Sequence, residues 1–130
     1  MELKVAGKDR KLNFGVRFAA LLDESDKYQA DGIEFGLGLA MAEEKLEMGS
    51  LETLARVVKC ALHRESVTLN DVYDALDEYA NEEKLDEVFE KIEEELKNSN
   101  AVRTAKSRQE KMRTEANRKK GLQAVKHTKK

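Results

Sequence analysis

The sequence predicts a mainly α-helical chain, with about five helices in a compact domain, a short N-terminal β-hairpin and a basic, helical C-terminal arm. Composition is the first reason for this prediction. The 130 residues include no Pro or Trp, only 5% of them are aromatic, and the helix formers Ala, Leu, Glu and Lys are abundant. The second is spacing, because the apolar period changes from 2 to about 3.6 near Gly15. The third is charge: residues 1–100 carry 24 acidic and 13 basic side chains, whereas residues 101–130 carry two acidic and eleven basic ones. We therefore expect an acidic domain over residues 1–100 and a basic arm over residues 101–130.

The N-terminal segment alternates apolar and polar residues, as a β-strand does. Leu3 and Val5 share one face, Leu12 and Phe14 share another, and the polar linker AGKDRK lies between them. We expect a hairpin with a Gly-containing turn, whose apolar face rests on helices because an isolated hairpin is marginal in water. No strand is expected after residue 30.

Helical spacing begins at Val16 and continues along the domain. A short stripe covers residues 16–22, and residues 33–48 are expected to form one helix whose first half is buried. Gly49 would end this helix, and Ser50 would cap the next one. The apolar stripe of that next helix consists of Leu51, Leu54, Ala55, Val58, Ala61 and Leu62.

Two further helices complete the domain. Thr68 and Asp71 have the spacing of a capping box. The buried face of their helix is expected to comprise Leu69, Val72, Tyr73 and Leu76. Asn81 is expected to cap the last helix, whose acidic start suits the positive end of the helix dipole. The apolar stripe of this last helix is formed by Leu85, Val88, Phe89, Ile92 and Leu96.

The stretch FGLGLAM places Gly36 and Gly38 inside the most apolar run of the chain. A phosphate-binding loop is disfavoured, because Met41 replaces the third glycine of the dinucleotide fingerprint, no convincing strand precedes the run, and no G-K-[S/T] follows. Inside a helix each glycine costs about 1 kcal/mol relative to alanine. We therefore expect both glycines in, or at the start of, a helix that closely approaches another element, namely the helix over residues 51–62.

No group of residues has the spacing of a catalytic or metal site, so we expect no enzymatic activity, no metal and no cofactor. Cys60, on an apolar helix face, is expected to be an inert core thiol. His63, near a helix C-terminus, is expected to hold a partly charged imidazole. Residues 35–42, the longest apolar run, are too few for a bilayer, and the N-terminus lacks a secretory signal. The chain is therefore expected to be soluble and intracellular.

The arm is expected to be helical when it lies against another surface. Val102, Ala105, Met112 and Ala116 form a weak apolar seam. The cations of the arm could follow a phosphate backbone, but no aromatic residue is present to stack on bases, and the domain is acidic. We favour contact with protein, in the same chain or a neighbouring copy; nucleic acid and a solvated tail stay open. The residues expected to make these contacts are Arg103, Lys106, Arg108, Lys111, Met112 and Arg113.

Three motifs resemble the tail assembly chaperones of long-tailed, siphovirus-like bacteriophages: FGVRF at residues 14–18, GIEFGLGLA at residues 32–40 and LARVVKCAL at residues 54–62. The similarity covers residues 11–96 and leaves the arm outside. It implies a non-enzymatic protein of the host bacterial cytoplasm that binds the largely helical tape measure protein before the tail tube polymerises, and that is absent from the finished virion. In that family the gene often also yields a longer product by frameshifting.

The resemblance and the division of charge together predict a homo-oligomer. For the client we expect helix-in-groove capture by spare apolar surface, and the stripe of the last domain helix, residues 85–96, is our choice of surface. The alternative function is a nucleic-acid-associated phage regulatory protein that uses the basic arm. Steep weakening of binding with salt would distinguish this alternative from apolar capture.

Overall fold

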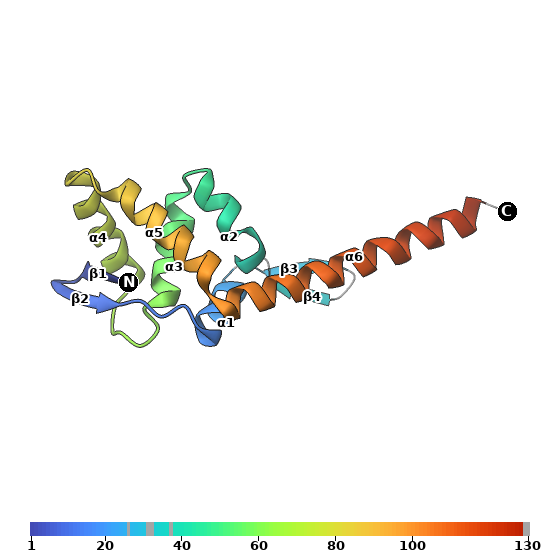
Figure 1. The fold of residues 1–130 in the computed structure, drawn as a ribbon, viewed down its shortest axis with the longest axis horizontal. Helices are drawn as coiled ribbons and strands as arrows, with labels where there is room; N and C mark the ends of the chain where they lie inside the picture. The colour runs from blue at the N-terminus through green and yellow to red at the C-terminus, as the bar shows by residue number, and fades with distance from the viewer. Residues whose placement is uncertain (26, 31–32, 37, 129–130) are drawn as a thin grey trace.

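Six helices and two β-hairpins make up the part of the chain that the computed structural model describes, which is residues 1–25, 27–30, 33–36 and 38–128. Side chains are described for residues 1–25, 38–112, 114 and 115. In chain order the elements are β1 (Glu2–Val5), β2 (Lys8–Lys11), α1 (Val16–Glu24), β3 (Lys27–Ala30), β4 (Ile33–Gly36), α2 (Gly38–Glu47), α3 (Leu51–Ala61), α4 (Leu69–Asn81), α5 (Leu85–Asn98) and α6 (Asn100–Thr128). Figure 1 shows α1 to α5 gathered into a body from which α6 runs out. The predicted fold class, mainly α with an N-terminal hairpin, is confirmed.

The N-terminal hairpin of β1 and β2 has a shorter turn than predicted. Only Ala6 and Gly7 join the strands, with φ angles of 51° and 80°. Two successive positive φ angles suit a two-residue hairpin turn, whose twist matches that of the strands. The polar residues that we assigned to the linker therefore form β2. Leu3 and Val5 of β1 are buried, at 4% and 1% exposure, so the hairpin rests its apolar face on the body as expected.

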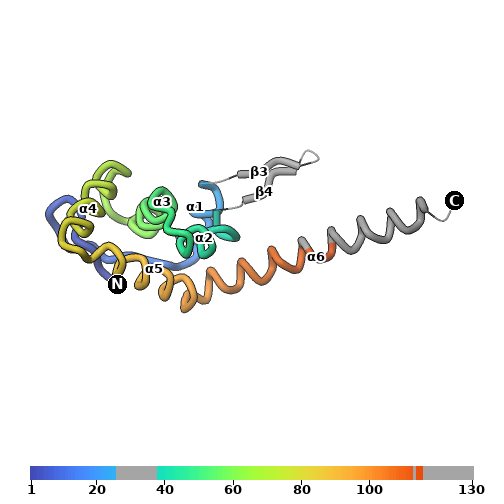
Figure 2. The backbone as a smooth tube through the Cα atoms, turned by 90° about the horizontal axis from the view of Figure 1, so that it is seen from above, coloured from blue at the N-terminus to red at the C-terminus, as the bar shows by residue number. Residues whose placement is uncertain are grey.

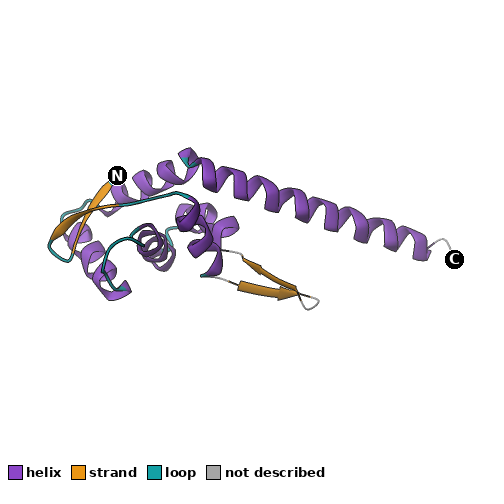
Figure 3. Cartoon of the chain, turned by 90° about the horizontal axis from the view of Figure 1, so that it is seen from below, coloured by secondary structure: helices purple, strands orange, loops and turns teal. Residues whose placement is uncertain are grey.

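A second antiparallel hairpin, formed by β3 and β4, contradicts two predictions. Strands do follow the first thirty residues, and residues 33–48 are not one helix, because α2 begins at Gly38. The sequence carries the reason: Tyr28 pairs with Phe35, and such aromatic residues favour strands. They flank an Asp-Gly dipeptide, which is a strong hairpin signal between alternating apolar residues. Figure 3 shows this hairpin projecting from the helical body.

The core is centred on α1, α2 and α3, which all contact one another. Its largest side chains are fully buried and include Phe18 and Leu22 of α1, Leu39 and Leu46 of α2, and Leu54 of α3. A single apolar cluster of this kind extends from the first hairpin to the start of α6, so the body folds around one core.

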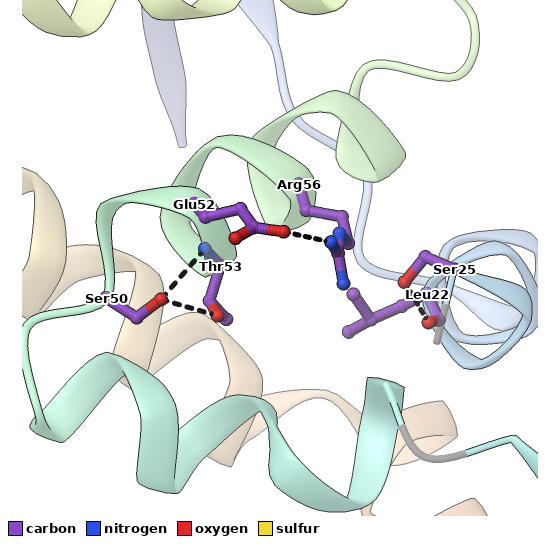
Figure 4. Close-up of polar contacts among 6 residues, drawn as sticks. All are labelled: Leu22, Ser25, Ser50, Glu52, Thr53 and Arg56. Carbon is purple, nitrogen blue, oxygen red and sulfur yellow. Dashed lines mark hydrogen bonds and ion pairs between the residues drawn. The ribbon is translucent and has the colours of Figure 1, made fainter. Parts of the chain in front are cut away.

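The start of α3 has the predicted cap. The hydroxyl oxygen of Ser50 accepts a hydrogen bond from the Thr53 amide at 3.2 Å and donates one to the Thr53 hydroxyl at 2.8 Å (Figure 4). Of the predicted stripe, Leu54, Ala55, Val58, Ala61 and Leu62 are buried. Leu51 is 53% exposed, so the prediction is wrong there, because this first helical residue lies at the rim of the core.

The capping box of α4 is also confirmed. The Thr68 amide donates to the Asp71 carboxylate at 2.9 Å, and the Asp71 amide donates to the Thr68 hydroxyl at 3.1 Å. The exposed fractions on the predicted buried face are 0% for Val72, 6% for Leu76, 43% for Leu69 and 37% for Tyr73. The prediction is wrong for the last two, because α4 turns Ala75 rather than Tyr73 towards the core.

The predicted cap at Asn81 is wrong. Asn81 is the last residue of α4, and α5 begins at Leu85 after Lys84, whose side chain makes no capping hydrogen bond. The amide of Lys84 instead donates to the Tyr79 carbonyl at 2.8 Å and closes the end of α4. The continuous helical spacing of α4 therefore outcompetes the capping preference of the asparagine side chain.

Gly38 lies at a close approach between helices, as predicted, but its partner differs. A Cβ atom at Gly38 would lie 1.9 Å from the carbonyl oxygen of Leu22 and 3.0 Å from the hydroxyl of Ser25. The neighbour is therefore α1 and not α3. Gly36 ends strand β4, so the expectation of a helical position is wrong there, and its packing lies outside the described side chains.

Candidate functional site

An apolar groove of about 520 Å³ lies between α1 and α6, with part of α2 along it. We call it the α1–α6 groove; it is lined by Val16, Ala19, Ala20, Asp23, Leu39, Asn100, Ala101, Thr104 and Ala105. Most of these side chains are small and apolar, so the groove exists because two facing helices carry methyl groups where larger side chains would fill the space. Val16, at the start of α1, is 78% exposed and forms an accessible apolar rim.

The α6 wall of the groove is fixed to the body by packing and by polar contacts. Val102 is 1% exposed, which places the first turn of α6 in the core. The side chain of Lys106 forms an ion pair with Glu43 of α2 at 3.1 Å. The side-chain amide of Gln109 donates to the Asp23 carboxylate of α1 at 2.9 Å. These contacts come from three consecutive turns of α6, and they fix the distance between α6 and α1 across the groove.

The junction before α6 is capped by Ser99. Its hydroxyl donates to the carbonyl oxygen of Phe14 at 2.6 Å and accepts from the Val102 amide at 3.2 Å. A single side chain therefore caps α6 and ties it to the segment that leads into α1. This contact sets the direction in which α6 leaves the body.

Asp23, one of the polar residues that line the groove, accepts a hydrogen bond from Gln109 of α6, which is not a lining residue. One oxygen of each side chain, Asp23 Oδ1 and Gln109 Oε1, is buried and has no hydrogen-bond partner in the described part of the chain. Unsatisfied buried oxygens cost free energy.

The outward side of α6 carries exposed side chains. We call this stripe, which includes Arg103, Ser107, Arg108 and Lys111, the free face of α6; a hollow of about 740 Å³ runs along it. One helix alone walls that hollow, so it is an exposed surface and not an enclosed site. Of the expected arm contacts, Lys106 pairs within the chain, Met112 is 65% exposed, and the side chain of Arg113 lies outside the described ones.

The stripe that we chose for client binding packs mostly inward. Val88, Ile92 and Leu96 are 3%, 0% and 1% exposed and belong to the core in this conformation. Leu85 and Phe89 are half-buried and pack against the core. Client binding by this stripe stays a prediction.

Spacing could have revealed the groove. Val16, Ala19, Ala20 and Asp23 follow the i, i+3, i+4, i+7 pattern on α1, and Ala101, Thr104 and Ala105 follow it on α6. The predicted stripes were identified mainly by large apolar residues. These two stripes were missed because alanine and threonine add little to an apolar pattern.

Neither Cys60 nor His63 has an environment suited to nucleophilic chemistry. Burial raises the pKa of the half-buried Cys60 thiol, against the opposing charges of Lys59 and Arg56, so the thiol stays protonated. Burial lowers the pKa of His63, and Arg17 and Arg64 lower it further. The expectation of a partly charged imidazole is therefore wrong, because these effects outweigh the helix terminus.

The described side chains contain no group of three or more His, Cys, Asp or Glu residues that could hold a metal ion. None of the described helices combines the length and apolar character needed to cross a bilayer.

The model of a known family, phage tail assembly chaperone protein, TAC, matches residues 2–110. The match confirms the resemblance drawn from residues 11–96 and extends it. The matched residues end at 110, so they include the turns of α6 that line the groove. Comparison with curated proteins and with solved structures gives no match.

Proposed function

The chain belongs to the family of phage tail assembly chaperones, and from this premise we propose that it binds the tape measure protein through the α1–α6 groove. The family suggests a non-enzymatic role. The client in this proposal is a long helical protein whose apolar stripes would aggregate if left bare. Binding keeps it soluble in the host cytoplasm until the tail tube forms, and the chaperone then leaves, so that it is absent from the virion.

The groove supports this proposal because it is largely apolar and is lined mostly by small side chains. Small side chains on α1 and α6 let a third helix approach closely, and the exposed rim at Val16 extends the apolar contact. Two client side chains of leucine size would contribute roughly 3–6 kcal/mol of transfer free energy. After the costs of association this is a weak site, which tolerates different client sequences.

Weak sites become effective when many copies act on one chain. A long client with repeated apolar stripes would hold several chaperones, and their linkage would add avidity. We include in the proposal that the chain acts as a homo-oligomer, and that a longer frameshifted form could join the same assembly. Leu85 and Phe89 of α5 are half-buried and offer the client a second contact apart from the groove.

The proposal is tested by co-expression with a tape measure fragment, followed by a solubility assay and a pull-down. The groove variant combines Val16→Asp with Ala20→Asp; both positions are exposed, so the fold should persist. We expect it to lose most of the captured fragment, since charge in an apolar groove must be desolvated.

The matched control combines Met48→Asp with Leu51→Asp, which adds the same two charges at apolar residues that are 85% and 53% exposed and lie outside the groove. It should capture the fragment as the wild type does. Equal capture by the groove variant, shown to be folded by circular dichroism, would contradict the proposal.

A further inference from the structure

The α1–α6 groove continues along α6 into a second depression. Asn100 and Thr104 line both the groove and the hollow on the free face of α6, so the two meet over the first turns of that helix. Arg108 lies about one helical turn beyond Thr104, and Lys111 about two turns beyond it, on the same side of α6. Figure 2 shows α6 running on beyond α1 and α2. A helix that lies in the groove and follows α6 therefore passes from small apolar side chains to two cations.

The cations beyond the groove have no anionic partner in the described part of the chain. Arg108 and Lys111 are exposed, and neither forms an ion pair with another described side chain. Lys106, by contrast, is paired with Glu43. Met112 lines the same hollow and is 65% exposed. We call Arg108, Lys111 and Met112 the basic extension of the groove.

Acidic side chains lie before and after the basic extension along α6. Asp23 lines the groove, and Glu115 lines the hollow about one turn beyond Lys111. A carboxylate on a bound helix is repelled at both of these places and attracted at the extension between them. The attraction is therefore restricted to one stretch of α6, so it depends on where the bound helix carries its charge.

We propose that the basic extension binds acidic side chains of the client helix, placed about two turns from the apolar residues that fill the groove. This inference rests on the proposed function, since it takes the groove as the client site, and it adds the chemistry by which a client segment is selected. Apolar burial alone accepts any amphipathic helix, whereas a charge contact at a fixed spacing discriminates between helices.

An acidic helix suits this surface better than nucleic acid does. The extension is continuous with an apolar groove, and its exposed Met112 offers further apolar contact, which a phosphate backbone would not use. Residues 101–130 also contain no aromatic side chain on which bases could stack.

The test measures the binding of labelled, alanine-rich helical peptides to the full chain. Every peptide has a pair of leucines one turn apart for the groove. In one acidic peptide a pair of glutamates follows the leucines by about two turns, and in another it precedes them by the same spacing, because a helix can run in either direction along α6. The neutral and basic peptides carry glutamine and lysine at these positions.

Two protein variants separate the extension from the overall charge of the chain. The extension variant combines Arg108→Glu with Lys111→Glu. The matched control combines Lys8→Glu with Arg64→Glu, which changes the net charge equally at exposed residues that line neither the groove nor the hollow. Circular dichroism checks that both variants are folded.

Fluorescence anisotropy at low salt should show that the wild type binds one acidic peptide about fivefold more tightly than the neutral peptide of the same layout, since each exposed charge pair contributes little. Added salt should reduce this preference. The control variant should keep the preference. The extension variant should lose it and bind the basic peptide more tightly than the acidic one.

A groove variant without added charge, Val16→Asn with Ala20→Asn, separates this inference from the proposed function. It should weaken the binding of every peptide. Equal binding of acidic and neutral peptides by the wild type, weakened in the groove variant, would leave the proposed function standing and overturn the charge contact. A preference for acidic peptides that the extension variant retains would also overturn it, as would binding of duplex DNA through the extension in place of the acidic peptides. Failure of every peptide to bind would contradict both proposals.

Discussion

Replacing Gly38 by alanine should destabilise the protein, although alanine is the better helix former. The added Cβ atom would lie 1.9 Å from the Leu22 carbonyl oxygen and 2.9 Å from the carbonyl carbon, whereas ordinary contact begins near 3.4 Å. The shortfall of about 1.5 Å falls on backbone atoms, which cannot rotate away as a side chain can. The helices α1 and α2 would therefore have to separate.

The surroundings of Leu22 offer little relief. Its carbonyl oxygen accepts hydrogen bonds from the Ser25 hydroxyl at 2.6 Å (Figure 4) and from the Ser25 amide at 3.2 Å. Overpacking of this kind costs about 1–3 kcal/mol, against a gain of at most about 1 kcal/mol from helix propensity. The overlap falls on backbone atoms, which places the cost near the upper end of this range and leaves a net loss of roughly 2 kcal/mol. With a urea m-value near 2 kcal/mol/M, the midpoint of unfolding should fall by roughly 1 M.

Urea unfolding followed by circular dichroism measures this change. The control is Gly49→Asn: nothing lies within 4 Å of a Cβ atom there, and asparagine tolerates the φ of 80°. It should shift the midpoint much less. Adding Ser25→Ala to Gly38→Ala should not restore stability, because the Leu22 carbonyl remains in place. A Gly38→Ala protein as stable as the wild type would refute the steric argument.

Two further predictions concern the free energy of unfolding. Thr68→Ala should lower it by about 1 kcal/mol, because it removes one half of the capping box of α4, whereas Thr68→Ser should retain most of it; urea midpoints of both variants would check this, and equal midpoints would contradict it. The lowered pKa of His63 means that the unfolded chain binds its proton more readily than the folded chain, so stability should fall as pH drops below the ordinary value of 6.5. His63→Leu should reduce the difference between midpoints measured near about pH 7.5 and about pH 5.5; an unchanged difference would assign it to other groups.

Predictions that rested on local spacing succeeded where one physical rule dominated. The capping box at Thr68 and the cap at Ser50 follow from side chains that bond their own helix start. Failures came where two local rules competed, as in residues 33–48. Apolar periodicity there favoured a helix, but an Asp-Gly dipeptide between strand-forming residues favours the hairpin that forms.

The groove shows why a functional surface is harder to predict than a fold class. Its two walls come from stripes of small residues about 85 positions apart, joined by the contact between Asp23 and Gln109. Small residues are equally suited to a close helix contact and to an open groove. Which of the two they form depends on how far apart the helices are held, and residues elsewhere on α6 set that distance.

The sequence by itself determined the mainly helical class, the opposite net charges of residues 1–100 and 101–130, the caps of α3 and α4, and the family resemblance. These depend on composition, period and short motifs, which act over a few residues. Only the tertiary structure decided that Ala75 faces the core in place of Tyr73, that Gly38 meets Leu22, and that α6 runs out from the body. Spacing specifies which residues share a face, but the packing of distant elements determines what that face meets.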